Sequence, residues 1–64
     1  MKVTILMSTY NGENFLAEQI ESIKQQTYTD WTLLIRDDGS KDKTRDIIKR
    51  FASEDDRIVF INPD

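Results

Sequence analysis

The stretch WTLLIRDDGS (residues 31–40) carries the pattern that decides the fold. Its first five residues are apolar or β-branched without interruption, which is typical of a strand covered on both faces in a parallel sheet. The run stops at Arg36, where charged residues and a glycine replace the apolar ones. We therefore predict a buried strand over residues 31–35 that ends in a polar turn.

Two further runs of the same kind flank this strand in the sequence. Residues 3–7 (VTILM) are nearly all apolar and contain three β-branched side chains, and residues 58–61 (IVFI) are wholly apolar. Both are predicted to be strands. Asn62-Pro63-Asp64 follows the last run and predicts a turn, because proline has no N–H to donate to a strand ladder.

Between the three strands, the apolar residues follow a helical period. Leu16, Ile20 and Ile23 are spaced i, i+4 and i+7, which predicts an amphipathic helix from about Asn14 that ends at residues 25–27. A second helix is predicted to bury one apolar face, made of Ile47, Ile48, Phe51 and Ala52. Ser40 or Asp42 is expected to cap its N-terminus.

The resulting order is β-α-β-α-β, an α/β fold. Two right-handed crossovers of this kind give three parallel strands with flanking helices. Such a unit is half of a doubly wound domain, and a chain of 64 residues buries only about 60% of the surface that it exposes when unfolded. We therefore expect residues 1–64 to be the N-terminal part of a larger domain.

The composition excludes several kinds of site. The chain has no cysteine and no histidine, which excludes disulfides, thiolate or imidazole metal ligands, and nucleophiles activated by histidine. Nine basic against 12 acidic residues give a net charge of −3, which argues against binding to the nucleic acid backbone. No apolar run approaches the ~18 residues of a membrane span, and no signal-peptide cleavage site is present, so a cytoplasmic location is expected.

Two polar clusters, residues 8–11 and 37–40, follow the first and second strands, at the edge where open parallel sheets bind ligands. There, the Tyr10 ring can stack on a planar base. The ionised carboxylate of Asp38 only accepts hydrogen bonds, so it suits the N3–H of uracil or thymine and repels the N3 lone pair of cytosine. With the Ser8 hydroxyl available to a base carbonyl or a ribose, these residues predict a pyrimidine pocket.

Structural roles and other sites compete with this interpretation. Tyr10 taken alone is more typical of an aromatic residue packed on the end of the sheet, and Asp37 is expected to shape the turn. A dinucleotide-binding unit would place G-x-G-x-x-G after the first strand, where this chain has STYNGE (residues 8–13). The acidic residue after the second strand fits such a unit, so that alternative stays open; a P-loop and an EF-hand are absent.

Three segments taken together resemble the start of family 2 glycosyltransferases, which have the GT-A fold. They are MSTYNGE (residues 7–13), IESI with QT (residues 20–27), and IRDDGSKDKT (residues 35–44). The family pattern is (S/P)-x-Y-N followed by D-D-G-S-x-D-x-T, and the resemblance covers essentially the whole chain. The wording LLIRDDGS (residues 33–40) is most similar to bacterial polysaccharide rhamnosyltransferases.

The resemblance implies a nucleotide-binding role for four residues. Tyr10 corresponds to the aromatic residue that stacks on the base, Ser8 to a hydroxyl that contacts the nucleotide, and Asp38 to the carboxylate that holds the pyrimidine N3–H. Asp37 matches the pattern as well and is expected to support the geometry of the loop.

The resemblance also implies an activity: inverting transfer of a sugar, such as rhamnose, from a UDP- or dTDP-sugar to a polysaccharide or glycolipid acceptor. The family's D-x-D motif, which binds Mg²⁺ or Mn²⁺, and its catalytic base are absent from residues 1–64, so no catalytic or metal-binding residue is expected here. Peripheral association with the inner face of a membrane fits a lipid-linked acceptor. The alternative is a non-catalytic βαβαβ module that binds a nucleotide or a partner.

Overall fold

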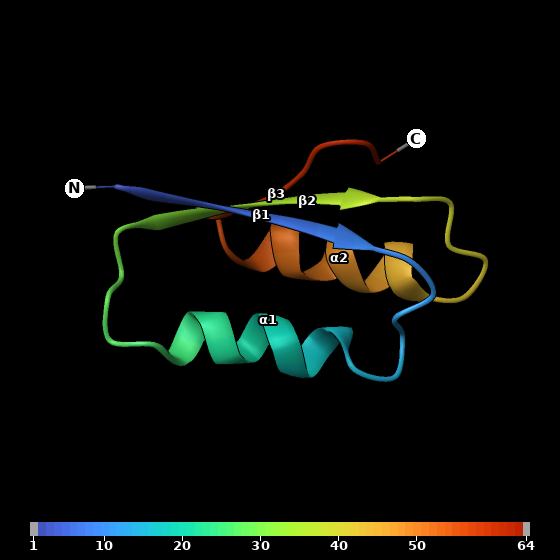
Figure 1. Ribbon diagram of the computed structural model, residues 1–64, viewed down its shortest axis with the longest axis horizontal. Helices are drawn as coiled ribbons and strands as arrows, with labels where there is room; N and C mark the ends of the chain where they lie inside the picture. The colour runs from blue at the N-terminus through green and yellow to red at the C-terminus, as the bar shows by residue number, and fades with distance from the viewer. Residues whose placement is uncertain (1, 64) are drawn as a thin grey trace.

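The computed structural model of the protein describes residues 2–63. Three parallel strands form its sheet (Figure 1). The elements in chain order are β1 (Val3–Thr9), α1 (Leu16–Gln25), β2 (Trp31–Asp37), α2 (Thr44–Glu54) and β3 (Ile58–Phe60). The strand order is β1-β2-β3, so β2 is central. The predicted β-α-β-α-β order is therefore confirmed.

Both helices lie on the same face of the sheet, below it in Figure 1. Two right-handed crossovers that step in the same direction across the sheet place both helices on one side. The side chains that β2 turns toward the helices, at positions 31, 33, 35 and 37, are all buried. The core between sheet and helices consists of Leu16, Ile20, Trp31, Leu33, Ile35, Ile48, Phe51 and Ile58.

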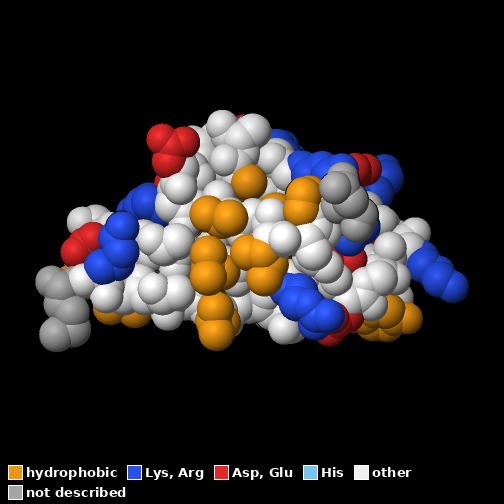
Figure 2. Space-filling view, turned by 90° about the horizontal axis from the view of Figure 1, so that it is seen from above, with side chains coloured by type: hydrophobic (Ala, Val, Ile, Leu, Met, Phe, Trp, Pro, Cys, Tyr) orange, Lys and Arg blue, Asp and Glu red, His pale blue; other side chains and the backbone are white. Residues whose placement is uncertain are grey.

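The other face of the sheet has no covering element in the described part of the chain, in keeping with the expectation that these residues are one half of a doubly wound domain. Leu6, Leu34 and Val59 form one row across the three strands on this face. Leu6 is 77% exposed there. Figure 2 shows apolar side chains gathered on this surface.

Several boundaries differ from the prediction. The strands β1 and β2 each continue two residues further, because Ser8, Thr9, Arg36 and Asp37 still pair in the ladder despite their polarity. The N-cap residue of α2 is Lys43, which makes no side-chain capping bond, so the prediction that Ser40 or Asp42 caps this helix is wrong. Asp42 lies one residue earlier, and its Oδ1 accepts the N–H of Thr44 at 2.9 Å. Ser40 does not cap this helix, because its hydroxyl donates to Asp37 instead. Asp64, the last residue of the predicted C-terminal turn, lies outside the described residues.

A cluster of Arg57, Asp55, Thr29 and Trp31 lies where β2 and β3 begin. The guanidinium of Arg57 lies over the Trp31 ring, 4.0 Å from its centroid. It donates to both oxygens of Asp55, at 3.1 Å from Nε and 2.8 Å from Nη2, and to the Thr29 carbonyl at 3.1 Å. These hydrogen bonds from Arg57 lower the pKa of Asp55 to about 2. The cluster ties the end of α2 to the first residue of the central strand.

Candidate nucleotide-binding site

The carboxyl ends of β1 and β2 meet at one edge of the sheet. Thr9 and Asp37 are the last register pair of the two strands. Beyond this pair, the N–H of Asp38 donates to the Thr9 carbonyl at 2.9 Å. Tyr10 and Asp38 therefore leave the sheet from adjoining backbone positions, as the sequence predicted for these two residues.

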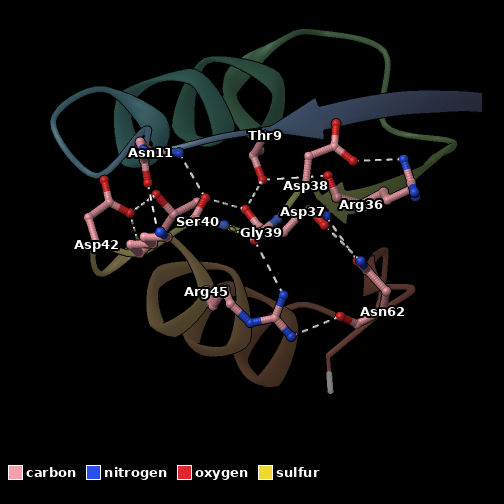
Figure 3. A network of polar contacts seen from close by, with 12 residues as sticks. Thr9, Asn11, Arg36, Asp37, Asp38, Gly39, Ser40, Asp42, Arg45 and Asn62 are labelled. Carbon is pink, nitrogen blue, oxygen red and sulfur yellow. Dashed lines mark hydrogen bonds and ion pairs between the residues drawn. The ribbon is translucent and has the colours of Figure 1, made fainter.

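The Asp37 carboxylate is buried at the centre of this edge, and its side chain is fully inaccessible to solvent (Figure 3). It accepts hydrogen bonds from the Thr9 hydroxyl at 2.8 Å, the Ser40 N–H at 2.8 Å and the Gly39 N–H at 3.2 Å. The Ser40 hydroxyl and the guanidinium of Arg45 also donate to it. Every donor belongs to the chain, so Asp37 organises the two strand ends and the turn between β2 and α2.

Burial by itself would raise the pKa of the Asp37 carboxyl. The donors from Ser40, Thr9 and Arg45 outweigh this effect and lower the pKa to about 2. Asp37 is thus ionised at neutral pH although it is buried, as expected for a carboxylate that accepts several hydrogen bonds in a fixed geometry.

Asn62 and Arg45 complete this arrangement, and the sequence analysis missed both. The Asn62 side chain bonds the backbone of Asp37 twice, accepting its N–H at 2.9 Å and donating to its carbonyl at 2.8 Å. Arg45 reaches the carboxylate of Asp37 with one nitrogen and the carbonyl of Asn62 with another, at 3.0 Å. The Asn62-Pro63 pair indicated only a turn, and Arg45 had no neighbour in the sequence that would point to its partner.

The loops after β1 and β2 are locked to each other by side chains of the second loop. Three consecutive N–H groups of the first loop donate across to it: Asn11 to Ser40 Oγ at 2.8 Å, Gly12 to Thr44 Oγ1 at 2.7 Å, and Glu13 to Asp42 Oδ2 at 3.2 Å. In return, the Asn11 side chain accepts the N–H of Lys41 at 2.9 Å. Within DGSKDKT (residues 38–44), the side chains of Ser40, Asp42 and Thr44 therefore bond to the opposite loop.

This lock bears on the dinucleotide-binding alternative. A unit of that kind uses free N–H groups in the turn after its first strand to hold a pyrophosphate. Here, side chains of the same chain already satisfy the N–H groups of residues 11–13. The geometry of the loop therefore disfavours that alternative.

Two residues in these loops have positive φ angles, Asn11 at 48° and Gly39 at 86°. Asparagine tolerates the left-handed region better than most residues, and glycine enters it without steric cost. At Gly39, this conformation lets the backbone turn so that the N–H groups of residues 39 and 40 both point at the Asp37 carboxylate.

The other predicted site residues remain open to solvent. Tyr10 is 63% exposed, and Ser8 is exposed on the uncovered face of the sheet. The side chain of Asp38 is 48% exposed, and its Oδ1 accepts one hydrogen bond, from Arg36 Nη1 at 2.7 Å. The structure thus separates the two adjacent acidic residues into a buried one, Asp37, and an accessible one, Asp38.

Within residues 2–63, no group of three or more acidic side chains is placed so that it could hold a metal ion. No helix among the same residues is long and apolar enough to cross a membrane.

A parallel β-α-β-α-β unit with a polar edge at the carboxyl ends of its strands is half of a Rossmann-like domain. The family model "Glycosyl transferase family 2" matches residues 4–64, and the chain belongs to that family. Its fold is the N-terminal half of a GT-A domain. The resemblance of the sequence to family 2 glycosyltransferases is therefore confirmed.

The chain is also similar to curated proteins that are named as glycosyltransferases. The chain is 48% identical over 61 residues to the putative glycosyltransferase EpsE of Bacillus subtilis, covering 94% of this chain and 22% of that protein. It is 43% identical over 59 residues to WfgD of Escherichia coli, a UDP-Glc:alpha-D-GlcNAc-diphosphoundecaprenol beta-1,3-glucosyltransferase, covering 92% of this chain and 22% of the relative.

A third relative is the GalNAc(5)-diNAcBac-PP-undecaprenol beta-1,3-glucosyltransferase of Campylobacter jejuni. It is 30% identical over 59 residues, covering 92% of this chain and 19% of that protein. The chain thus spans about a fifth of the length of the curated relatives that it matches.

Proposed function

We propose that this chain forms the nucleobase-binding part of a glycosyltransferase that uses a pyrimidine nucleotide sugar as donor. The division of labour between Asp37 and Asp38 is the observation that carries the proposal. Asp37 is fully engaged by the chain and fixes the two loops, whereas Asp38 and Tyr10 follow the ends of neighbouring strands at the same edge and are accessible. A rigid frame with one accessible carboxylate, which is paired with Arg36 on the same surface, and one accessible aromatic ring suits a planar ligand with an N–H on its edge.

In the proposed complex, the pyrimidine ring stacks on Tyr10 and its N3–H donates to the Asp38 carboxylate. The Ser8 hydroxyl contacts the nucleotide from the uncovered face of β1. Asp37 is a positioning residue, because it touches only groups of this chain and acts by holding the turn that presents Asp38. Uracil and thymine fit this arrangement, since both have an N3–H, while cytosine presents a lone pair there.

The relatives support a finer proposal for donor and acceptor. The name of WfgD specifies UDP-glucose as donor and a diphosphoundecaprenol-linked sugar as acceptor, and the name of the Campylobacter jejuni relative also specifies an undecaprenol diphosphate. We accordingly propose a UDP- or dTDP-sugar donor and a lipid-linked saccharide acceptor for polysaccharide synthesis. Such an acceptor would bring the protein to the cytoplasmic face of a membrane. The support for dTDP-rhamnose as the donor comes from the sequence of residues 33–40 alone.

The residues that perform the transfer are proposed to lie outside this segment. A divalent cation, Mg²⁺ or Mn²⁺, would supply charge neutralisation for the leaving diphosphate, and residues 2–63 offer no ligand set for it. A base outside the segment would take the proton of the acceptor hydroxyl as that oxygen attacks the anomeric carbon with inversion. The part played by residues 2–63 is to bind and orient the base of the donor.

Calorimetric titration of the full-length protein with UDP, dTDP and CDP tests the base preference. We expect CDP to bind at least ten-fold more weakly than UDP, because a buried lone pair facing a carboxylate is repulsive. In D38N the difference should shrink, since an amide can either accept from N3–H or donate to a cytosine N3. Equal affinities for UDP and CDP in the wild-type protein would contradict the role of Asp38.

Transfer is tested separately from binding. Incubation of the full-length protein with UDP-glucose, Mg²⁺ or Mn²⁺ and an undecaprenol-diphosphate saccharide should release UDP. Release of UDP by the wild-type protein, and a higher KM for UDP-glucose in Y10A, would support the enzyme. Tight UDP binding without transfer to any lipid-linked or free saccharide would favour the non-catalytic module instead.

A further inference from the structure

The four arginines of the chain differ in how firmly the structure holds them. Arg57 has two acceptor residues and lies over the Trp31 ring, and Arg45 bonds Asp37 and Asn62 and lies 5.1 Å from the centroid of the Phe60 ring. Both therefore have an evident structural purpose.

Arg50 and Arg36 are exposed, but their surroundings differ. Arg50 lies over the Phe51 ring, 5.1 Å from its centroid. The side chain of Arg36 is 60% exposed and, among residues 2–63, its polar partner is the Asp38 carboxylate, which it bonds through one nitrogen. An exposed ion pair of this kind contributes little to stability. Arg36 is thus the arginine whose position the fold explains least.

The backbone places Arg36 directly at the candidate site. It precedes Asp37 on the central strand, so its side chain points to the opposite face from that buried carboxylate. On this uncovered face it pairs in register with Ser8 of β1. The Ser8 hydroxyl, the Arg36 guanidinium and the Asp38 carboxylate therefore follow one another along the accessible side of the strand ends.

The Arg36–Asp38 pair presents a donor next to an acceptor. Figure 3 shows the two side chains turned toward each other and away from the buried network around Asp37. The pair uses Nη1 of the arginine and Oδ1 of the aspartate. In the described part of the chain, Nη2 and Nε of Arg36 and Oδ2 of Asp38 have no hydrogen-bond partner. A free N–H and a free carboxylate oxygen consequently lie side by side.

We propose that Arg36 is a specificity-determining residue that reads the base together with Asp38, an inference that rests on the proposed function. The imide edge of uracil or thymine carries a carbonyl on each side of its N3–H. When Asp38 accepts the N3–H, the free N–H groups of Arg36 donate to one of these flanking carbonyls. The ion pair thereby forms a two-point complement to the imide edge, and binding of the base shields it from water, which strengthens both contacts.

The test combines a side-chain change with an atomic change in the ligand. UDP, 2-thio-UDP and 4-thio-UDP are titrated into the full-length wild-type protein and into R36M, with R36K as a variant that keeps one cationic donor. A thiocarbonyl is a weaker acceptor than a carbonyl, so replacing the contacted oxygen should weaken binding to the wild-type protein. The exposed Arg50 supplies the matched control, R50M.

We expect one of the two thio analogues to bind the wild-type protein several-fold more weakly than UDP. In R36M, UDP itself should bind roughly ten-fold more weakly. The penalty for that analogue should disappear in R36M, because the donor that senses it is gone, and persist in R50M. R36K should fall between the wild-type protein and R36M.

Three results would overturn the proposal. Thio penalties that are equal in the wild-type protein and R36M, including no penalty in either, would show that Arg36 contacts no carbonyl of the base. Unchanged UDP affinity in R36M would have the same meaning. If the wild-type protein binds none of UDP, dTDP or CDP, the proposed function fails together with this inference, whereas binding that is indifferent to Arg36 overturns the inference alone.

Discussion

Asp37 and Asp55 are two aspartates with the same lowered pKa, about 2, at opposite ends of the central strand. Asp55 owes its acidity chiefly to Arg57, two residues away in the sequence. Asp37 accepts hydrogen bonds from β1, from the turn after β2 and from α2. A hydrogen-bonded aspartate therefore joins residues close in sequence at one end of the strand and assembles the candidate site from separate segments at the other.

Substitutions at the two ends of the strand should therefore have different effects on stability and on ligand binding. A change at Asp55 should weaken the fold and leave the distant edge intact. A change at Asp37 should weaken the fold and also displace the turn that carries Asp38. A change at Tyr10 or Asp38, which are exposed, should affect binding alone.

Acid should have the largest effect, because it acts on both carboxylates. Each folded-state pKa lies near 2 against an ordinary value of 3.8, so each contributes about 2 kcal/mol at neutral pH. The lowered pKa values mean that this stability is fully present above about pH 4 and is lost as the pH falls toward 2.

Urea unfolding of the full-length protein between pH 6 and pH 2 measures this dependence. The free energy of unfolding should fall by about 4 kcal/mol from these two groups together. The double variant D37N/D55N should show a correspondingly flatter profile. An identical pH dependence in the double variant would contradict the assignment of these two carboxylates.

The variant D37N should lower the free energy of unfolding by about 3 kcal/mol, since it leaves the Arg45 cation without its buried partner and points an amide at the donors of Ser40. It should also weaken UDP binding. The neighbouring exposed residue gives the matched control: D38N should keep the stability of the wild-type protein while losing the base preference. Stability of D37N equal to that of D38N would contradict the structural role of Asp37.

The sequence predicted the elements and the edge but not how they are held. Apolar runs and helical periods were enough for the order β-α-β-α-β, because burial of one face determines those patterns. A role of Asp37 in the turn was expected, but its burial was not, because the alternation of side chains along β2 sends Asp37 inward and Arg36 outward only once the strand extends to residue 37. The prediction that Ser40 caps α2 was wrong for a similar reason, since its hydroxyl finds a tertiary partner in Asp37.

Partners that are distant in the sequence could not be predicted at all. Asn62 and Arg45 meet Asp37 only after the chain has folded, and the bonds from residues 11–13 to the second loop join positions about 30 residues apart. No local pattern encodes such pairs. The uncovered face of the sheet follows from the strand order, because both crossovers step in the same direction. Apolar runs in the sequence do not predict that order.

The variant D55N should have a smaller effect, lowering the free energy of unfolding by about 2 kcal/mol and leaving the affinity for UDP unchanged. The amide cannot form an ion pair with Arg57, although its oxygen still accepts one hydrogen bond. Asp56 is the adjacent exposed aspartate, and D56N is the matched control, with no expected change. Weakened UDP binding in D55N would show that the two ends of the strand are not independent.

The smallest effect on unfolding is expected at Tyr10, which is largely exposed. Y10A should unfold like the wild-type protein yet bind UDP roughly 1–3 kcal/mol more weakly, because it removes a stacking surface. Y10F keeps the ring and should bind UDP nearly as well. If folded Y10A binds UDP with wild-type affinity, Tyr10 has no role in binding the base.

The most direct test of the account is a crystal structure of the full-length protein with UDP bound. We expect the uracil ring to lie flat against Tyr10, with its N3 about 3 Å from an Asp38 oxygen, and the hydrogen bonds around Asp37 to remain as they are without ligand. A uracil ring at another edge of the sheet, or an N3–H donated to Asp37 in place of Asp38, would contradict it.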